Sequence, residues 1–217
     1  MKYLIVCNGD APSKALLQRE MATADRVMSC DGGAETLARY GWKADGMVGD
    51  FDSLGRRRAD ELAALWQCEM MVLDEDKDQT DTQVAIELAI GAGAKEIVLL
   101  GALGGRFDHA LGNALLLIKC ERAGVKAVIY DEQNEIRVTC TVLILPGKVG
   151  DMLSVLPLGV NARIRCTDGL AYPLYDRDLD LGDTLTLSNR YDAEEALIDV
   201  AHGWVCVIRS HDEERGM

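Results

Sequence analysis

The hydrophobic pattern of this chain changes character near residue 131. Before that point, short apolar runs bounded by Gly and Asp alternate with amphipathic stretches, which is typical of strand-helix units around a parallel sheet. After it, the helical period fades and β-rich segments follow one another with turn residues between them. We therefore expect an α/β domain with a mainly parallel sheet over residues 1–131, followed by an all-β, sandwich-like domain over residues 132–217.

The pattern places individual elements. In the first domain, strands are expected at 3–7, 26–30, 46–49, 70–73, 96–100 and 127–130. Helices fit between them at 12–23, 34–40, 57–66, 82–90 and 108–123. Pro12 suits the first turn of its helix, and Thr80 with Gln83 resembles a capping box. In the second domain, strands are expected at 135–139, 142–145, 152–157, 161–166, 184–188, 196–200 and 205–209.

Composition narrows the range of partners. Lys and Arg total 23 against 36 for Asp and Glu, a net charge of −13. This net negative charge repels nucleic-acid backbones and anionic lipid surfaces, so neither is expected as a partner. A cationic small molecule is the more natural ligand. The seven cysteines form no Cys-x-x-Cys pair and indicate buried thiols in a reducing cytoplasm. The apolar N-terminus ends at Asn8-Gly9-Asp10, too short for a signal sequence or membrane span.

Seven carboxylates cluster in two short stretches, 49–53 and 74–81, with few Lys or Arg nearby to pair with them. If the two stretches meet, they would hold a divalent cation. Mg²⁺ is the best candidate because hard cations take oxygen ligands, and Mg²⁺ is commonly held by one or two carboxylates together with substrate phosphates. This pattern indicates phosphoryl chemistry.

The acids follow predicted strands. Asp31-Gly32-Gly33-Ala34 comes after one strand and Asp50-Phe51-Asp52-Ser53 after another, so both lie at carboxyl ends, where open α/β sheets bind ligands. If the chain stays extended there, Asp50 and Asp52 share one face. For Asp31 alone, a turn or helix cap is an equal alternative. For Asp50, Asp52, Asp78 and Asp81 together, function is favoured, because four caps need no such concentration of charge. Four other acids are interpreted as surface residues: Asp45, Asp60, Glu61 and Glu69.

A third motif, residues 101–109, again joins a predicted strand to a helix. Its glycines leave backbone N–H groups open to phosphate, although the stretch matches neither a Walker A loop nor the dinucleotide fingerprint. Arg106 suits phosphate, while Asp108 and His109 add an acceptor and a titratable ring. For His109, hydrogen bonding to its neighbours in the helix N-terminus is an equal alternative to direct chemistry.

Taken in order, residues 31–34, 49–53, 76–81 and 101–109 resemble the motifs of the thiamine pyrophosphokinase family, and the resemblance continues at 169–174 and at Ser188-Asn189. It implies an N-terminal α/β domain and a C-terminal β-sandwich in a homodimer, with active sites between the subunits. It also implies a Mg²⁺-dependent enzyme in which the thiamine hydroxyl attacks the β-phosphorus of ATP and AMP is released.

By the same resemblance, each motif receives a role. The metal and catalytic centre would consist of Asp31, Asp50, Asp52 and Asp81. The nucleotide and substrate pocket would be lined by Asp78, Thr80, Gly104, Arg106, Asp108 and His109. Ser188 and Asn189 would contact thiamine. Which Asp accepts the alcohol proton stays open.

Two residues depart from the family pattern. Lys77 stands where relatives often have Gln, and Arg190 follows Ser188-Asn189 where many bacterial members have Glu. Two other functions remain alternatives. One is a phosphatase of the haloacid-dehalogenase type, suggested by Asp50-x-Asp52 but weakened by Leu54, where Thr or Val is usual. The other is a sensor that binds nucleotide or thiamine without turnover, against which the complete set of acids argues.

Overall fold

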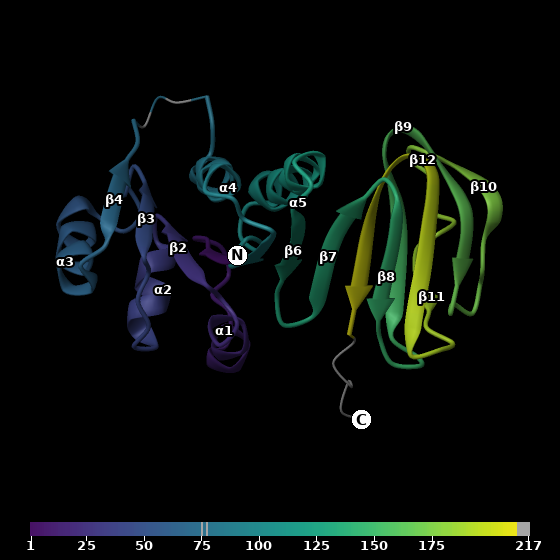
Figure 1. Cartoon of the computed structure of the whole chain (residues 1–217), viewed down its shortest axis with the longest axis horizontal. Coiled ribbons are helices and arrows are strands. Elements are labelled where there is room, and N and C mark those ends of the chain that lie inside the picture. Colours follow the sequence, from purple (N-terminus) through teal and green to yellow (C-terminus); the bar gives the residue numbers. More distant parts are fainter. Residues whose placement is uncertain (75, 77, 212–217) are drawn as a thin grey trace. The chain divides into compact units, whose positions relative to one another are not determined.

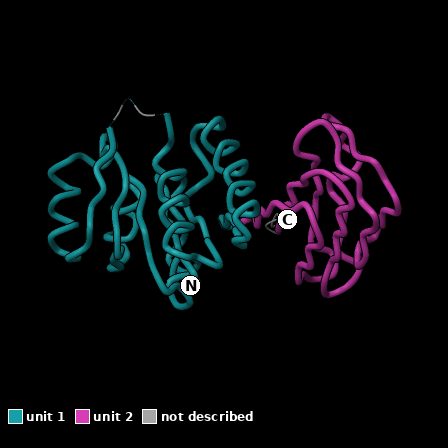
Figure 2. Tube along the Cα trace, turned by 45° about the horizontal axis from the view of Figure 1, so that its top comes forward, with its two compact units in different colours: residues 1–132 teal, residues 133–217 magenta. Residues whose placement is uncertain are grey.

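The computed structural model describes residues 1–74, 76 and 78–211 (Figure 1), so Glu75 and Lys77 lie outside the described residues. Contacts between residues divide the chain into two compact units, Met1–Glu132 and Gln133–Met217 (Figure 2). The division falls one residue after the boundary expected from the sequence. None of the helices in the described part of the chain is both long and apolar enough to cross a membrane.

The first unit is built on a parallel sheet, as predicted. Its strands pair in the order β6-β5-β1-β2-β3-β4, and every pair is parallel. Strand bounds lie within one residue of the predicted ones: β1 (Lys2–Val6), β2 (Arg26–Cys30), β3 (Gly46–Gly49), β4 (Glu69–Val72), β5 (Glu96–Leu100) and β6 (Lys126–Tyr130). The order reverses at β1, because β2 to β4 lie on one side of it and β5 and β6 on the other.

Helices cover both faces of this sheet. On one face, Leu16 and Leu17 of α1 and Leu37 of α2 pack against Leu4 and Val6 of β1. On the other face lie α4 and α5 (Figure 1). The helices are α1 (Lys14–Met21), α2 (Gly33–Arg39), α3 (Arg56–Trp66), α4 (Asp81–Gly91) and α5 (Phe107–Arg122).

Of the two predicted helix N-termini, one is wrong and one is confirmed. Ser13 is the N-cap of α1 and accepts a hydrogen bond from the Leu16 N–H at 3.1 Å, so placing Pro12 in the first turn was wrong. Thr80 caps α4 as predicted, because its Oγ1 accepts from the Gln83 N–H at 3.2 Å. The Gln83 side chain donates to Glu87 at 2.9 Å.

The second unit is an antiparallel β domain in which β10, β9, β12 and β7 pair in that order, with β8 on β12 and β11 on β9. Its strands are β7 (Asn134–Thr139), β8 (Val142–Pro146), β9 (Met152–Asp168), β10 (Tyr175–Asp180), β11 (Asn189–Arg190) and β12 (Glu195–Ser210). Both β9 and β12 were predicted as two short strands each. They are continuous because the chain bends at register shifts between Asp199 and Trp204 while pairing continues.

One further strand prediction in this unit was wrong, and the strand β10 was missed. Residues 184–188 form a turn, in which the Thr186 hydroxyl donates to the Val155 carbonyl and the Val155 N–H donates to the Thr186 carbonyl at 3.1 Å. In β10, which was not predicted, only Leu179 is buried, so the strand lacks an apolar alternation. Arg163 of β9 holds it through Asp176 and Asp178.

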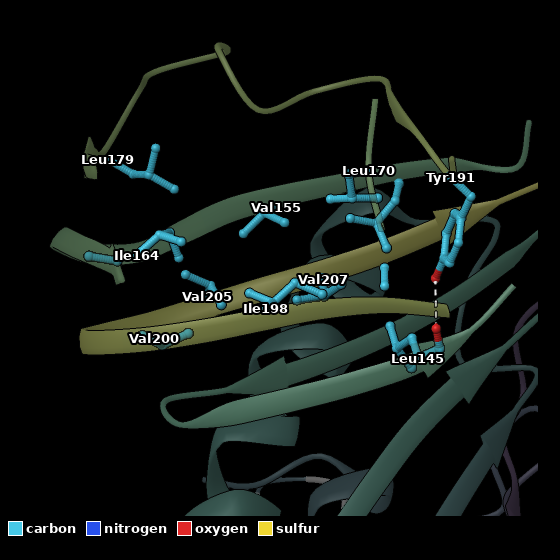
Figure 3. Close-up of a cluster of buried hydrophobic side chains, with 13 residues drawn as sticks. Leu145, Val155, Ile164, Leu170, Leu179, Tyr191, Ile198, Val200, Val205 and Val207 are labelled. Carbon is cyan, nitrogen blue, oxygen red and sulfur yellow. Dashed lines mark hydrogen bonds between the residues drawn. The ribbon is translucent and has the colours of Figure 1, made fainter. Parts of the chain in front are cut away.

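One apolar cluster forms the core of the second unit (Figure 3). Val155 and Ile164, from the two halves of β9, meet Ile198 and Val205, from the two halves of β12. Tyr191 closes one end of the cluster, and its hydroxyl donates to the Leu145 carbonyl at 3.5 Å. Burial raises the pKa of Tyr191 to about 12, so this hydroxyl keeps its proton.

Candidate active site

A cavity of about 560 Å³ opens at the carboxyl edge of the parallel sheet. The segments after β1, β2, β3 and β5 line it, together with the start of α4 and the first turns of α5. The sheet order reverses between β1 and β5, and the crevice at such a reversal is the usual ligand site of an open α/β sheet. The first unit therefore places its candidate site where this fold class binds ligands.

Three acids form a compact group in this cavity. Asp31, Asp50 and Asp52 each offer a carboxylate oxygen, and these oxygens lie within 4.8 Å of one another. Asp31 is only 6 % exposed, whereas Asp50 is half-buried and Asp52 is exposed. Carboxylates so close repel one another unless a cation lies between them. Oxygen donors of this kind suit a hard divalent ion such as Mg²⁺.

A sharp bend, and not an extended chain, brings Asp50 and Asp52 together. Phe51 has a φ of +60°, so the expected extended geometry was wrong. Its ring is buried in the cluster beneath α2 and α3, which anchors the bend between the two acids. The Asp52 N–H donates to Asp50 Oδ1 at 3.2 Å. Burial of Phe51 is thus what sets both carboxylates at the cavity.

Asp31 is held from two sides. Asn8 Nδ2 donates to its Oδ2 at 3.0 Å, and the Leu54 N–H donates to its Oδ1 at 3.3 Å. The following helix α2 has Gly32 as its N-cap and no side-chain capping bond, which removes the helix-cap interpretation of Asp31. The carboxylate is therefore fixed in the cavity wall by the segments that follow β1 and β3.

Asp81 reaches the same cavity from the first residue of α4. It lies outside the group of three, but its Oδ2 is close to the end of β3, because a Cβ added to Gly49 would be 3.1 Å from it. Thr80 also lines the cavity, whereas Asp78 is exposed and is not among the lining residues. The second acidic stretch thus brings Asp81 to the first, while Asp78 lies away from the wall.

Most motif glycines serve close packing around the segment 7–10. A Cβ on Gly33 would lie 2.1 Å from the Val6 carbonyl oxygen, and one on Gly101 would lie 2.6 Å from that of Cys7. A Cβ on Gly104, where φ is +88°, would lie 2.0 Å from Asp10 Cγ. Gly105 differs, since nothing lies within 4 Å of its Cβ position. Of these four glycines, Gly105 alone leaves its surroundings open to a ligand.

Arg106 and His109 line the cavity beside Gly105. Arg106 Nη2 is 2.6 Å from Asp108 Oδ2, and this hydrogen bond holds the pKa of the Asp108 carboxyl below its usual value. Asp108 is exposed and is not among the lining residues, so the structure places it as the partner of Arg106. If Arg106 bound a phosphate, the phosphate would replace the Asp108 carboxylate as its anionic partner.

Sequence reasoning missed the segment after β1. Asn8, Gly9 and Asp10 all line the cavity, and Asn113 of α5 supports it by donating to the Ala102 carbonyl at 2.7 Å. The signal was their position after the first strand, where the sheet order reverses. Asp10 in particular adds a further acid to the cavity.

Cys7 and Cys30 are also among the residues that line the cavity. Thr82 Oγ1 donates to Cys7 Sγ at 3.5 Å, and a hydrogen bond from the Cys30 thiol lowers the pKa of Cys7 against the effect of burial. None of the seven cysteines, all of which lie in the described part of the chain, forms a disulfide. Four are buried as expected, but three are only partly buried: Cys68, Cys140 and Cys166.

The predicted thiamine contacts belong to the second unit. The Asn189 side chain is buried and bonds the backbone of Tyr172 twice, accepting from its N–H at 3.1 Å and donating to its carbonyl at 2.8 Å. Ser188 is exposed with a φ of +57°, and Arg190 is exposed beside it. Asn189 thus holds the loop 169–174 in place, while the Ser188 side chain is accessible.

Comparisons with known proteins agree over both units. The family models "Thiamin pyrophosphokinase, catalytic domain" and "Thiamin pyrophosphokinase, vitamin B1 binding domain" match residues 17–129 and 131–205. The chain is 31 % identical over 192 residues to the thiamine pyrophosphokinase of Bacillus subtilis strain 168, covering 84 % of this chain and 86 % of that protein.

Solved structures give the same result. The structure of thiamine pyrophosphokinase from Bacillus subtilis superposes with a TM-score of 0.86 at 25 % identity, covering 98 % of this chain and 100 % of that chain. That of thiamin pyrophosphokinase from Geobacillus thermodenitrificans superposes with a TM-score of 0.81 at 28 % identity, covering 99 % of each chain.

Proposed function

This chain belongs to the thiamine pyrophosphokinase family, a family of transferases, and we propose that it moves the diphosphate group of ATP to the hydroxyl of thiamine, giving thiamine diphosphate and AMP. The observation that carries the proposal is the group of Asp31, Asp50 and Asp52 at the switch point of the parallel sheet, inside the segment matched by the catalytic-domain model.

Charge supports a need for Mg²⁺. Five aspartates and one arginine are among the described residues that line the cavity. ATP is a polyanion, so these residues would repel it without a bridging cation. Asp31, Asp50 and Asp52 would hold the ion, with Asp81 completing the centre. When bound, Mg²⁺ would neutralise charge on the transferred phosphates.

The protein's own part in the reaction is alignment and proton acceptance. Transfer to an alcohol needs the reacting atoms in line and a weak base for the proton, which an aspartate of the centre can supply. Gly105, Arg106, Thr80 and His109 would bind the nucleotide phosphates. Ser188 would contact thiamine, and the negative field of the cavity would favour its cationic ring.

The enzyme would act as a homodimer with active sites at the subunit interface. An exposed apolar stripe on α5 supports this, because Phe107, Leu111 and Leu115 follow one another at four-residue spacing and are 78 %, 48 % and 43 % exposed. The stripe begins next to Arg106, which lines the cavity.

Sedimentation equilibrium tests the dimer. Leu111→Glu is expected to shift the protein to monomer, while Leu65→Glu, an equally apolar exposed site on α3, should leave the dimer intact. A wild-type monomer at assay concentration contradicts the proposal.

Seven cysteines without a disulfide support a cytoplasmic location, which cell fractionation tests.

The reaction is tested by measuring AMP with and without thiamine across Mg²⁺ concentrations. AMP should form only when thiamine, ATP and Mg²⁺ are all present. Asp52→Asn is expected to lower turnover by about 100-fold or more at saturating Mg²⁺, with Asp60→Asn, an exposed acid of α3, as the matched control. Phosphate release from monoesters without ATP would instead indicate the phosphatase, and ligand binding without turnover the sensor.

A further inference from the structure

Two thiols lie side by side at the wall of the cavity. Cys7 directly follows β1 and Cys30 ends β2, and these neighbouring parallel strands pair Val6 with Ser29. The register, carried one residue further, sets Cys7 beside Cys30. Both residues line the cavity, although they are only 4 % and 2 % exposed. Small reagents that enter the cavity therefore meet a wall with two neighbouring cysteines and not a lone one.

The spacing of the pair suits a bond between the sulfurs. Thr82 Oγ1 donates to Cys7 Sγ at 3.5 Å, and the register of β1 and β2 sets Cys30 beside Cys7. Neighbouring strands lie about 4.7 to 4.9 Å apart. Disulfides join residues whose Cα atoms are about 4.4 to 6.8 Å apart. A Cys7–Cys30 disulfide thus needs adjustment of the side chains and adjacent backbone, not a rearrangement of the sheet.

Each thiol is adjacent in sequence to the acidic centre. Cys30 precedes Asp31, and Cys7 precedes Asn8, whose Nδ2 holds Asp31 Oδ2 at 3.0 Å. The surrounding backbone is closely packed, because the Cβ positions of Gly33 and Gly101 lie 2.1 Å and 2.6 Å from the carbonyl oxygens of Val6 and Cys7. Drawing the two sulfurs together therefore displaces Asp31 relative to Asp50 and Asp52.

We propose that Cys7 and Cys30 are a modification site, at which a peroxide-class oxidant forms a reversible disulfide that disables the acidic centre. One thiol attacks the peroxide, the O–O bond breaks, and a sulfenic acid and one water form. The second thiol displaces the sulfenic oxygen as a second water, giving the S–S bond. In sum, two thiols lose two protons and two electrons, and hydrogen peroxide becomes two waters.

The first experiment follows the bond itself. The full-length protein is treated with hydrogen peroxide, its remaining thiols are alkylated, and it is digested without reduction for mass spectrometry. The expected product links the peptides that carry Cys7 and Cys30, and dithiothreitol separates them. Absence of this link after peroxide treatment overturns the proposal. The readout does not depend on the proposed function.

The second experiment follows the consequence and rests on the proposed function for its activity arm. Oxidised wild type is expected to lose at least tenfold in AMP formation and to lose its thermal shift with Mg²⁺, and dithiothreitol should restore both. A link that forms with activity and Mg²⁺ shift unchanged overturns the proposal. If untreated protein forms no AMP, the proposed function fails, and the Mg²⁺ shift alone tests the modification.

Variants identify the thiols. Cys30→Ser and Cys7→Ser, each compared with its own untreated rate, should resist peroxide, while Cys120→Ser, a buried thiol of α5, should stay as sensitive as wild type. Should a serine variant fail to fold, Cys30→Ala gives the same comparison. Equal sensitivity in Cys30→Ser or Cys30→Ala and in wild type contradicts the assignment.

Discussion

Replacing Asp31 by Asn removes one charge from the acidic centre and nearly preserves the shape of the side chain. At 4.8 Å, two carboxylates repel by about 3.5 kcal/mol at an effective dielectric constant of 20 and by about 0.9 kcal/mol in water. Asp31→Asn relieves this repulsion toward Asp50 and Asp52. The substitution also weakens the hydrogen bonds that Asn8 and Leu54 donate to residue 31, and this lowers stability. Hydrogen bonds to charged groups contribute about 1.5 to 3 kcal/mol, and neutral ones about 0.5 to 1.5 kcal/mol.

These effects oppose each other, so without metal the free energy of unfolding of Asp31→Asn should stay within about 2 kcal/mol of wild type. With Mg²⁺ present, the wild type and Asp31→Asn should differ in stability. A ligand at 100 times its dissociation constant stabilises the native state by about 2.7 kcal/mol, which raises the Tm of a protein of this size by roughly 5 to 10 °C. Asp31→Asn should lose this gain.

Thermal unfolding across Mg²⁺ concentrations, with no nucleotide present, measures both quantities. Asp60→Asn serves as the control, because it removes one exposed charge from α3 and should keep the full Mg²⁺ shift. The reasoning is refuted if Asp31→Asn keeps the wild-type shift with Mg²⁺. It is also refuted if the variant is much less stable than wild type without metal, since Asp31 would then be chiefly a structural residue.

Two further predictions concern the glycine loop and a surface ion pair. Gly101→Ala should lose activity and more than about 2 kcal/mol of stability in urea unfolding, because its Cβ meets the Cys7 carbonyl oxygen, whereas Gly105→Ala should cost only the roughly 1 to 2 kcal/mol of its left-handed backbone; equal losses would contradict this. A hydrogen bond from Arg58 lowers the pKa of Glu35 from 4.5, so the pair stabilises the fold above that pH and the benefit is lost as the pH falls through the lowered pKa. Glu35→Gln should therefore cost about 0.2 to 1 kcal/mol at pH 7, and progressively less as the pH falls through the lowered pKa of Glu35, in denaturant titrations; a loss that does not depend on pH would exclude the pair as its cause.

The first unit was predictable because most of its strands are buried on both faces, although β4 is largely exposed. Such strands are short apolar runs that end at Gly or Asp, as Arg26–Cys30 before Asp31 illustrates. The first and last residue of each strand can therefore be predicted from the run alone. The second unit was less predictable because its strand limits depend on partners. In β12, pairing continues through the bend near Gly203, whose residues look like a break in the sequence. In β10, charged residues pair with Arg163 across strands, which no alternation reveals.

The same distinction holds for the site. Asp50, Asp52 and Asp81 all line the cavity, and the sequence could single them out because few Lys or Arg lie near them along the chain. The role of Asp10 was not visible, because a single acid after the first strand becomes significant only when the sheet order is known. The geometry between Asp50 and Asp52 was mispredicted for a similar reason, since the bend comes from the burial of Phe51.

The motif glycines change meaning once the segment after β1 is in place. The Cys7 N–H donates to the Leu100 carbonyl at the end of β5 at 2.8 Å. The N–H groups of Gly9 and Asp10 donate to carbonyls of the loop that follows β5 at 2.7 and 2.8 Å, so pairing between β1 and β5 extends beyond both strands. Gly101 is a glycine because that pairing leaves no room for a Cβ, and a Cβ at position 104 would meet the Asp10 side chain. A glycine-rich motif at a sheet edge can therefore specify how two loops pack without cradling phosphate. In this chain, phosphate binding by the loop is expected only at Gly105 and Arg106, where the cavity is open.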